Sequence, residues 1–163
     1  MKLCGDLVLR TLCAPVSDID SNILSVMDDM VEMMKSQNGV GLAAPQVGIL
    51  SRFLVMMDPD TETVYRMINP HILEHGSDTC TMEEGCLSVL GHDGLPVYAN
   101  VTRPSSVIVE WTDESGTQKT AQMSGLPARI VQHETDHLDG KLFIDYLSPV
   151  RREMLMRKVR KRK

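Results

Sequence analysis

The stretch QHETDHLDG at residues 132–140 places two histidines around a glutamate in the pattern His-Glu-x-x-His. On a helix His133 and His137 share one face, so both imidazoles can reach the same metal ion. Glu134 can then point at a water on that ion rather than at the ion itself. The pattern predicts a hydrolytic metal site with its own base; the alternative is a helix with two ordinary polar histidines.

Catalytic metal sites usually keep three protein ligands and one open position, so a third ligand is needed. His71, His75 and His92 are candidates, but each is isolated in loop-like sequence. Cys86 is the better candidate, because it lies in MEEGCLSV between a glycine and a short apolar run. Read alone, that stretch also fits a small buried hydrophobic residue. A thiolate with two imidazoles suits Fe²⁺, Zn²⁺, Co²⁺ or Ni²⁺.

The helices that must position these residues can be read from apolar spacing and end signals. Residues 17–39 carry apolar side chains every three or four positions, with Asp18 or Ser21 as the expected cap and Asn38-Gly39 as the expected end. Residues 124–140 form the expected second helix, which carries His-Glu-x-x-His, with Ser124 as its cap and Gly140 as its end. A third helix is expected to begin near Ser148-Pro149 and to run through the basic tail.

The clearest β-strands are expected at residues 52–57, 63–69, 105–111 and 118–123. Turn signals at 58–60 and 113–116 separate them in pairs, which indicates antiparallel hairpins. Helices and strands do not alternate regularly, so we expect an α+β fold. In it, antiparallel β-sheets surround a central metal-binding His-Glu-x-x-His helix, with one helix near the N-terminus and one at the C-terminus.

Composition and charge narrow the class of protein. The 163 residues suit one domain, with neither a signal peptide nor a membrane-spanning run expected. The four cysteines form no CxxC pair, and we expect them to be thiols in the cytoplasm. Residues 151–163 hold eight Arg or Lys and one Glu, a net +7, so the rest carries −12 of the total of −5. We therefore expect a catalytic domain at 1–150 and a basic helical tail at 151–163.

Three segments in order resemble the motifs of one family, the peptide deformylases. They are GVGLAAPQVG (39–48), EGCLS (84–88) and QHETDHLDG. The resemblance extends over nearly the whole chain. It implies a bacterial-type enzyme that hydrolyses the formyl group from the N-terminal formyl-methionine of new polypeptides and releases formate. It also implies one Fe²⁺ per chain in the cell, with Zn²⁺, Ni²⁺ or Co²⁺ in some preparations.

The resemblance also implies roles for individual residues. The metal ligands would be Cys86, His133 and His137. Glu134 would be the general base and acid. The oxyanion would be bound by Gln46 and the backbone N–H of Leu87, and the substrate backbone by Gly41. An apolar slot is needed for the methionine side chain, and the candidates are Val40, Leu126 and Ile130, each of which could instead be plain core packing.

One connection departs from the family pattern. Leu90 stands where the family usually has a proline, and the run from Ser88 to Arg103 is about four or five residues longer than usual. We expect this loop near the cleft, where His92 and Asp93 either contact substrate or remain in solvent. Glu84 and Arg103 match family positions and are expected to form an ion pair that holds the second motif.

The expected partners follow from the reaction and from the tail. The substrates are formyl-methionyl nascent peptides, and residues 151–163 resemble a C-terminal helix that some bacterial deformylases dock on the ribosome. A partial apolar stripe of Met154, Leu155 and Val159 would contribute, while the basic residues meet rRNA phosphates; a solvated helix end is the alternative. We expect a monomer in the bacterial cytoplasm. The rival functions are a metallopeptidase and a non-catalytic binder of formyl-methionine N-termini.

Overall fold

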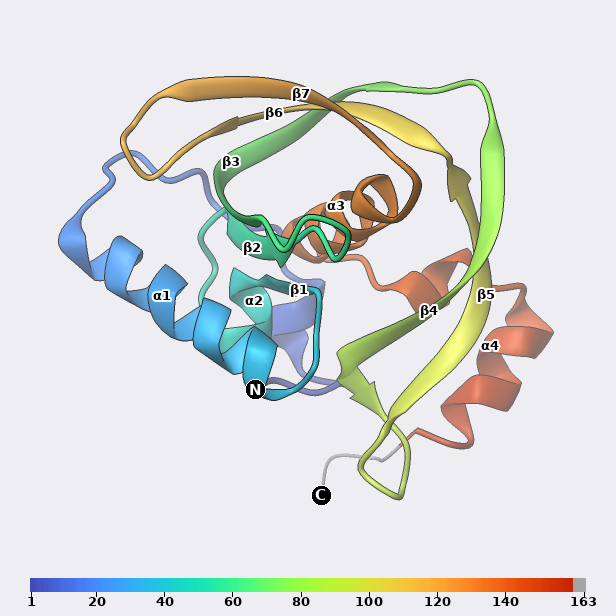
Figure 1. Ribbon diagram of the computed structural model, residues 1–163. Coiled ribbons are helices and arrows are strands. Elements are labelled where there is room, and N and C mark those ends of the chain that lie inside the picture. Colours follow the sequence, from blue (N-terminus) through green and yellow to red (C-terminus); the bar gives the residue numbers. More distant parts are fainter. Residues whose placement is uncertain (160–163) are drawn as a thin grey trace.

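The computed structural model describes residues 1–159 and has an α+β fold (Figure 1). Five strands form one sheet in the order β1-β2-β3-β6-β7, and β4 pairs with β5 in a separate two-stranded sheet. All pairings between these strands are antiparallel, which confirms the hairpins expected at 58–60 and 113–116. The bounds are β1 Gly41–Ala43, β2 Phe53–Met57, β3 Val64–His75, β4 Thr79–Leu90, β5 Pro96–Pro104, β6 Ser106–Thr112 and β7 Gln118–Ser124.

Helix α3, Gly125–Leu138, lies in the middle of the molecule between the two sheets (Figure 1). Its residues from Ala128 to Leu138 are all buried, including the polar ones. Ser124 occupies the N-cap position but its side chain makes no capping hydrogen bond. Gly140 follows the helix with a φ of 71°, a conformation that glycine adopts without steric cost. A helix this deeply buried holds its side chains in fixed positions.

Helix α1, Ser21–Ser36, covers the end of the five-stranded sheet that contains β1 and β2 (Figure 1). Its methionines pack in one buried cluster with strand residues such as Phe53 and Val55. The expected caps, Asp18 and Ser21, were wrong. Asp20 is the N-cap, and its carboxylate accepts a hydrogen bond from the Ile23 backbone N–H at 2.8 Å. Extended backbone at Asp20 places its carboxylate in line with that exposed N–H.

The C-terminal helix α4, Pro149–Met156, begins where the sequence predicts but ends earlier. After turns, the chain forms an antiparallel bridge from Val159 to Gly91. The basic residues 160–163 lie outside the described part. Leu155 and Val159 are buried in a cluster with Val89 and Phe143, so they are not a free apolar stripe. Shorter helical turns are η1 Leu7–Arg10, α2 Ala44–Val47 and η2 Phe143–Tyr146.

Strands β1, β4 and β5 were missing from the sequence prediction, and β3 extends well beyond its predicted end. Pairing with a neighbouring strand, rather than local composition, makes these residues extended. The four cysteines are free thiols, as expected. Within residues 1–159, every helix is too short or too polar to cross a lipid bilayer.

Candidate metal centre

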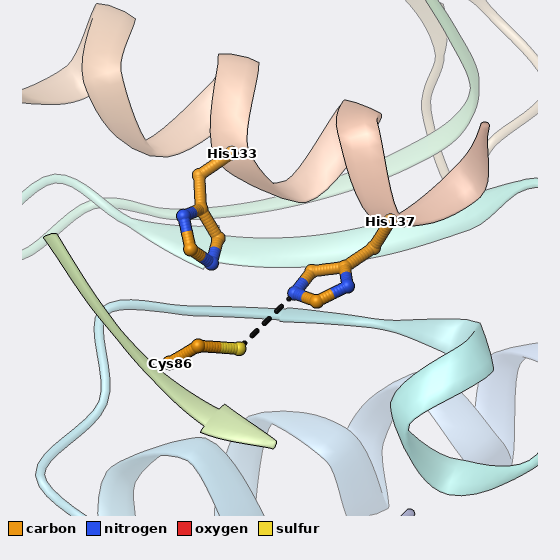
Figure 2. A group of neighbouring side chains, drawn as sticks. All are labelled: Cys86, His133 and His137. Carbon is orange, nitrogen blue, oxygen red and sulfur yellow. Dashed lines mark hydrogen bonds between the residues drawn. The ribbon is translucent and has the colours of Figure 1, made fainter. Parts of the chain in front are cut away.

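Strand β4 and helix α3 bring three candidate ligands together. His133 and His137 project from successive turns of α3, and Cys86 faces them from β4 (Figure 2). One ligand atom from each residue lies within 4.8 Å of the other two, and all three residues are buried. The Sγ atom of Cys86 is 3.2 Å from Nε2 of His137. Two ligands on one tetrahedral ion are roughly 3.5 Å apart, so the spacing fits a single metal ion.

The protonation of the imidazoles also suits a cation. Burial, followed by the nearby His133, holds the pKa of His137 well below its usual range, so this imidazole offers a lone pair. Burial opposes the charged form of His133 too, but hydrogen bonds with Cys86 and Glu84 outweigh it and raise the pKa. The negative groups that attract a proton here also attract a metal cation, which would displace that proton.

Glu84 orients His133 by accepting a hydrogen bond from its Nδ1 at 2.9 Å. This leaves Nε2 of His133 available to a metal ion. The expected ion pair is confirmed: Nε of Arg103 donates to Oε1 of Glu84 at 2.7 Å. Arg103 also donates to Asp136 at 2.6 Å, and Arg129 donates to Glu84 at 2.7 Å. Burial would raise the pKa of Glu84, yet its hydrogen bonds with His133 and Arg103 hold the pKa far below its usual range.

Glu134 lies beside the ligands, and burial raises its pKa to about 7. Its Oε2 atom is buried and has no hydrogen-bond partner among the described residues. The side chain packs directly on Gly41, where an added Cβ would come within 2.4 Å of Oε1 and 2.7 Å of Cγ of Glu134. Gly41 therefore leaves the space that this carboxylate occupies. A buried carboxyl near pKa 7 can both accept and donate a proton at neutral pH.

Gln46 points its amide group at the same centre. Its Oε1 accepts a hydrogen bond from the Ala43 backbone N–H at 2.8 Å, which directs Nε2 the other way. That Nε2 donates to Oγ of Ser88 at 3.1 Å and lies 3.6 Å from Sγ of Cys86. The short helix α2 and its left-handed end at Gly48 hold Gln46 in this position. An amide N–H₂ group fixed in this way is a ready donor to negative oxygen.

A cleft of about 260 Å³ opens onto these groups. Most of the expected site residues line it, namely Val40, Gly41, Gln46, Cys86, Leu87, Leu126, Ile130, His133 and Glu134. His137 is also expected at the site, and it lies almost fully buried against Cys86. Leu126 is partly exposed whereas Ile130 is buried, so the apolar lining runs from the rim into the interior.

Other histidines lie elsewhere. His71 and His75 line a separate cavity with residues such as Asp139. His92 is exposed at the β4–β5 turn, where its backbone N–H donates to the Lys158 carbonyl at 3.2 Å. Neither His92 nor Asp93 is among the lining residues of the cleft. The lengthened connection instead approaches the cleft through Pro96 and Tyr98, which line it from β5.

Sequence reasoning missed Arg129 and Tyr98. Arg129 precedes His133 by four positions, so the helical repeat that paired the histidines also places it on their face. Besides Glu84, Arg129 binds the carbonyl oxygens of Val101 at 3.0 Å and Cys80 at 2.6 Å. No sequence signal identified Tyr98, because its place in the cleft depends on β5 pairing with β4.

The family model described as polypeptide deformylase matches residues 2–153. A peptide deformylase of Endomicrobium trichonymphae is 44% identical over 164 residues, covering 100% of this chain and 94% of that protein. One from Rhizobium meliloti (strain 1021) is 39% identical over 159 residues, covering 96% of this chain and 88% of that protein.

Solved structures agree with these relatives. The crystal structure of peptide deformylase from Thermotoga maritima superposes with a TM-score of 0.82 at 40% identity, covering 91% of this chain and 96% of that one. The Ehrlichia chaffeensis peptide deformylase in complex with actinonin has a TM-score of 0.89 at 34% identity, covering 96% and 92%. The sequence and the fold of this chain therefore both match those of peptide deformylases over almost its entire length.

Proposed function

The chain belongs to the polypeptide deformylase family, and from that premise we propose which of its residues carry out the reaction. The enzyme is a metal-dependent hydrolase that removes the formyl group from the N-terminal formyl-methionine of nascent polypeptides. The convergence of a thiol, two imidazoles, a carboxyl and a carboxamide on one cleft is the observation that carries the proposed roles.

In this proposal Cys86, His133 and His137 hold the metal ion, with α3 as the central metal-binding helix. When bound there, the metal supplies Lewis acidity and lowers the pKa of a water towards neutrality. The ligand set supports one Fe²⁺ per chain, and the same atoms suit Zn²⁺, Ni²⁺ or Co²⁺ in preparations. Sγ of Cys86 lies close to Nε2 of His137, and the His137 imidazole is neutral. Both observations support the fit of such an ion.

Glu134 is proposed as the proton carrier. Its carboxylate accepts the proton of the attacking water and later delivers it to the leaving amine, so that formate and a free N-terminus result. The pKa of about 7 supports both halves of this transfer, because the group changes charge near neutral pH. Gly41 keeps the carboxyl close to the reacting carbon by leaving room for it.

Gln46 and the backbone N–H of Leu87 are proposed to stabilise the negative oxygen that develops on the formyl group. Losing one such donor typically costs roughly 3–4 kcal/mol of transition-state stabilisation. The Ala43 N–H supports this role, since it holds Oε1 of Gln46 and thereby turns the amide donor towards Cys86.

Substrate binding is proposed to use the remaining lining of the cleft. Gly41 in β1 offers backbone groups to an extended peptide, as an added strand would receive them. Val40, Leu126 and Ile130 supply apolar surface for the methionine side chain. A narrow site admits the small formyl group and crowds larger acyl groups, which provides selectivity by exclusion.

Formate release tests the reaction. The metal-loaded, anaerobically prepared protein should release formate from formyl-Met-Ala and leave unformylated Met-Ala intact. Cleavage of Met-Ala at its peptide bond would instead indicate a metallopeptidase. Tight binding of formyl-Met-Ala without formate would indicate a non-catalytic binder.

We further propose that residues 1–150 form the catalytic domain and that the basic tail, 151–163, contacts ribosomal RNA. Arg152 and Arg157 are exposed on the tail and support such a contact. Leu155 and Val159 pack inside the protein, so the contact would be mainly electrostatic and sensitive to salt. Co-sedimentation with ribosomes at low and high salt tests it, comparing the unmutated protein with Arg152→Glu/Arg157→Glu. Equal sedimentation of both would reject the contact.

The enzyme is proposed to be a monomer in the bacterial cytoplasm, where nascent polypeptides emerge and thiols stay reduced. The four free thiols support this compartment. Light scattering on the reduced protein tests the oligomeric state, and a mass of twice the chain would reject a monomer.

A further inference from the structure

Residues of β5 and α4, two elements labelled in Figure 1, line a groove of about 460 Å³. Its lining includes apolar side chains of Ala99 in β5 and Met154 in α4, and of Leu147 between η2 and α4. Two exposed cations, Arg151 and Lys158, also line it. Cavities of roughly 300–1,000 Å³ are typical of binding sites, so the groove is large enough for side chains of a bound peptide.

The cations of the groove are uncompensated, unlike Arg152 and Arg157. Arg152 pairs with Asp145 at 3.3 Å, and Arg157 pairs with Glu153 at 2.7 Å. Within residues 1–159, neither Arg151 nor Lys158 forms an ion pair. The two cations that face the groove are therefore available to an acidic ligand.

Tyr98 joins the groove to the catalytic cleft, because its side chain lines both. It pairs with Gly85 across β4 and β5, and an added Cβ on Gly85 would come within 2.4 Å of the tyrosine ring. The ring thus lies over the strand residue just before Cys86, yet the tyrosine remains 57% exposed. A chain leaving the metal centre along β4 would pass this ring before it reached α4.

The wall of the groove is held in place by the lengthened β4–β5 turn. Gly91 forms a β-bridge with Val159, and the backbone N–H of His92 donates to the Lys158 carbonyl at 3.2 Å. The Nε2 atom of His92 lies 3.3 Å from the Arg157 carbonyl oxygen. These contacts fix residues 157–159 before any ligand arrives, which lowers the entropic cost of binding.

We propose that this groove binds the part of the formylated polypeptide that follows its first residues, and that it prefers segments combining apolar and acidic side chains. The proposal rests on the proposed function, because the cleft must hold the formyl-methionine end. An extended chain advances roughly 3.3–3.6 Å per residue, so the groove is reached only by peptides longer than the shortest substrates. Nucleic acid would meet the same cations but would gain nothing from the apolar lining.

Deformylation kinetics with matched peptides test the preference. The substrates are formyl-Met-Ala and two peptides of about eight residues that share their first three residues and continue with Leu and Glu or with Leu and Lys. Two exposed ion pairs together give a gain of roughly 2- to 30-fold, so kcat/KM for the Glu peptide should exceed that for the Lys peptide by a factor in this range. The gain should shrink with added salt.

The double variant Arg151→Glu/Lys158→Glu should abolish or reverse the preference for the Glu peptide, so that its kcat/KM no longer exceeds that of the Lys peptide. Arg157→Glu is the matched control: it reverses the charge of another exposed cation, next to Lys158, that does not line the groove. It should keep the ratio of the unmutated enzyme.

Any of three results would reject peptide binding in the groove but not the proposed reaction. They are equal kcat/KM for both long peptides, an unchanged ratio of kcat/KM in the double variant, or an equal loss of that ratio in Arg157→Glu. Each requires that formyl-Met-Ala is still deformylated. Absence of formate from that dipeptide would reject the proposed function, and the groove proposal with it. If the double variant does not fold, the peptide ratio and its salt dependence in the unmutated enzyme decide.

Discussion

The side chain of Glu134 packs directly against the backbone of Gly41. The carboxylate lies where a side chain at position 41 would be, at distances that no Cβ atom tolerates. From the sequence, Gly41 was predicted only to bind the substrate backbone. The structure adds a contact with Glu134, the proposed proton carrier, which no spacing pattern could predict because it depends on β1 lying beside α3.

Gly41→Ala should therefore reduce kcat by about a hundredfold, since a misplacement of about 1 Å is enough for such a loss. Metal content should not change, because the atoms nearest to a Cβ at position 41 all belong to Glu134 and not to a proposed ligand. Gly39→Ala is the control: its Cβ would meet the flexible end of Leu87 at 3.0 Å, and the loss should be smaller. A rise in KM at constant kcat would show that Gly41 acts only on the substrate.

Buried ion pairs join β4, β5 and α3 behind the proposed metal ligands. Glu84 accepts from Arg103, Arg129 and His133. The sequence predicted the pair of Glu84 and Arg103 through the family resemblance. Arg129 escaped prediction, because arginine in a helix is usually exposed and its carbonyl partners come from other strands.

Glu84→Gln should weaken metal binding by about 10- to 100-fold, because His133 loses the carboxylate that orients it. It should also lower the melting temperature, since two buried arginines lose a charged partner. Titration of the metal against a chelator and thermal unfolding measure the two effects. Glu83→Gln, on the exposed neighbouring residue, should change neither. Equal metal affinity in Glu84→Gln and the unmutated protein would contradict this role.

The ion pair between Arg10 in η1 and Asp145 in η2 predicts a pH-dependent stability. Burial alone would raise the pKa of Asp145, but its hydrogen bond with Arg10 outweighs burial and lowers the pKa. A carboxyl with a lowered pKa stabilises the fold above its unfolded pKa of about 3.9, and this contribution is lost as the pH falls through the lower folded value.

Asp145→Asn should therefore reduce the free energy of unfolding by about 1 kcal/mol at pH 7. The difference from the unmutated protein should shrink as the pH drops below about 4, as urea unfolding at several pH values would show. A difference that stays constant down to pH 3 would contradict the ion-pair explanation.

Strands β4 and β5 show why part of the fold was not predictable from local sequence. Strand β4 contains residue types that strands usually avoid, at Glu83, Glu84 and Gly85, and prolines begin and end β5. Burial of Glu84 is possible only because arginines from β5 and α3 neutralise it. Strands β2, β6 and β7, which flank the predicted turns, were predicted close to their observed bounds.

At the scale of the whole molecule, folding brings segments forty to fifty residues apart into one centre. Gln46 and Cys86 are in contact across 40 positions, and Cys86 and His137 across 51. Family motifs predicted which residues would gather, whereas their orientation required the sheets around α3. The lengthened turn was expected near the cleft, but its tip instead contacts the C-terminal tail through Gly91 and His92.

The proposed mechanism assigns two kinds of group to the cleft: ligands that hold the metal and a carboxyl that moves the proton. Metal content and formate release, measured together on Glu134→Gln and Cys86→Ala, test it most directly. Glu134→Gln should keep one metal ion per chain and lose roughly 10²–10⁴-fold in kcat. Cys86→Ala should lose both metal and activity. A Glu134→Gln enzyme that deformylates at the unmutated rate, or a Cys86→Ala enzyme that keeps its metal, would contradict these roles.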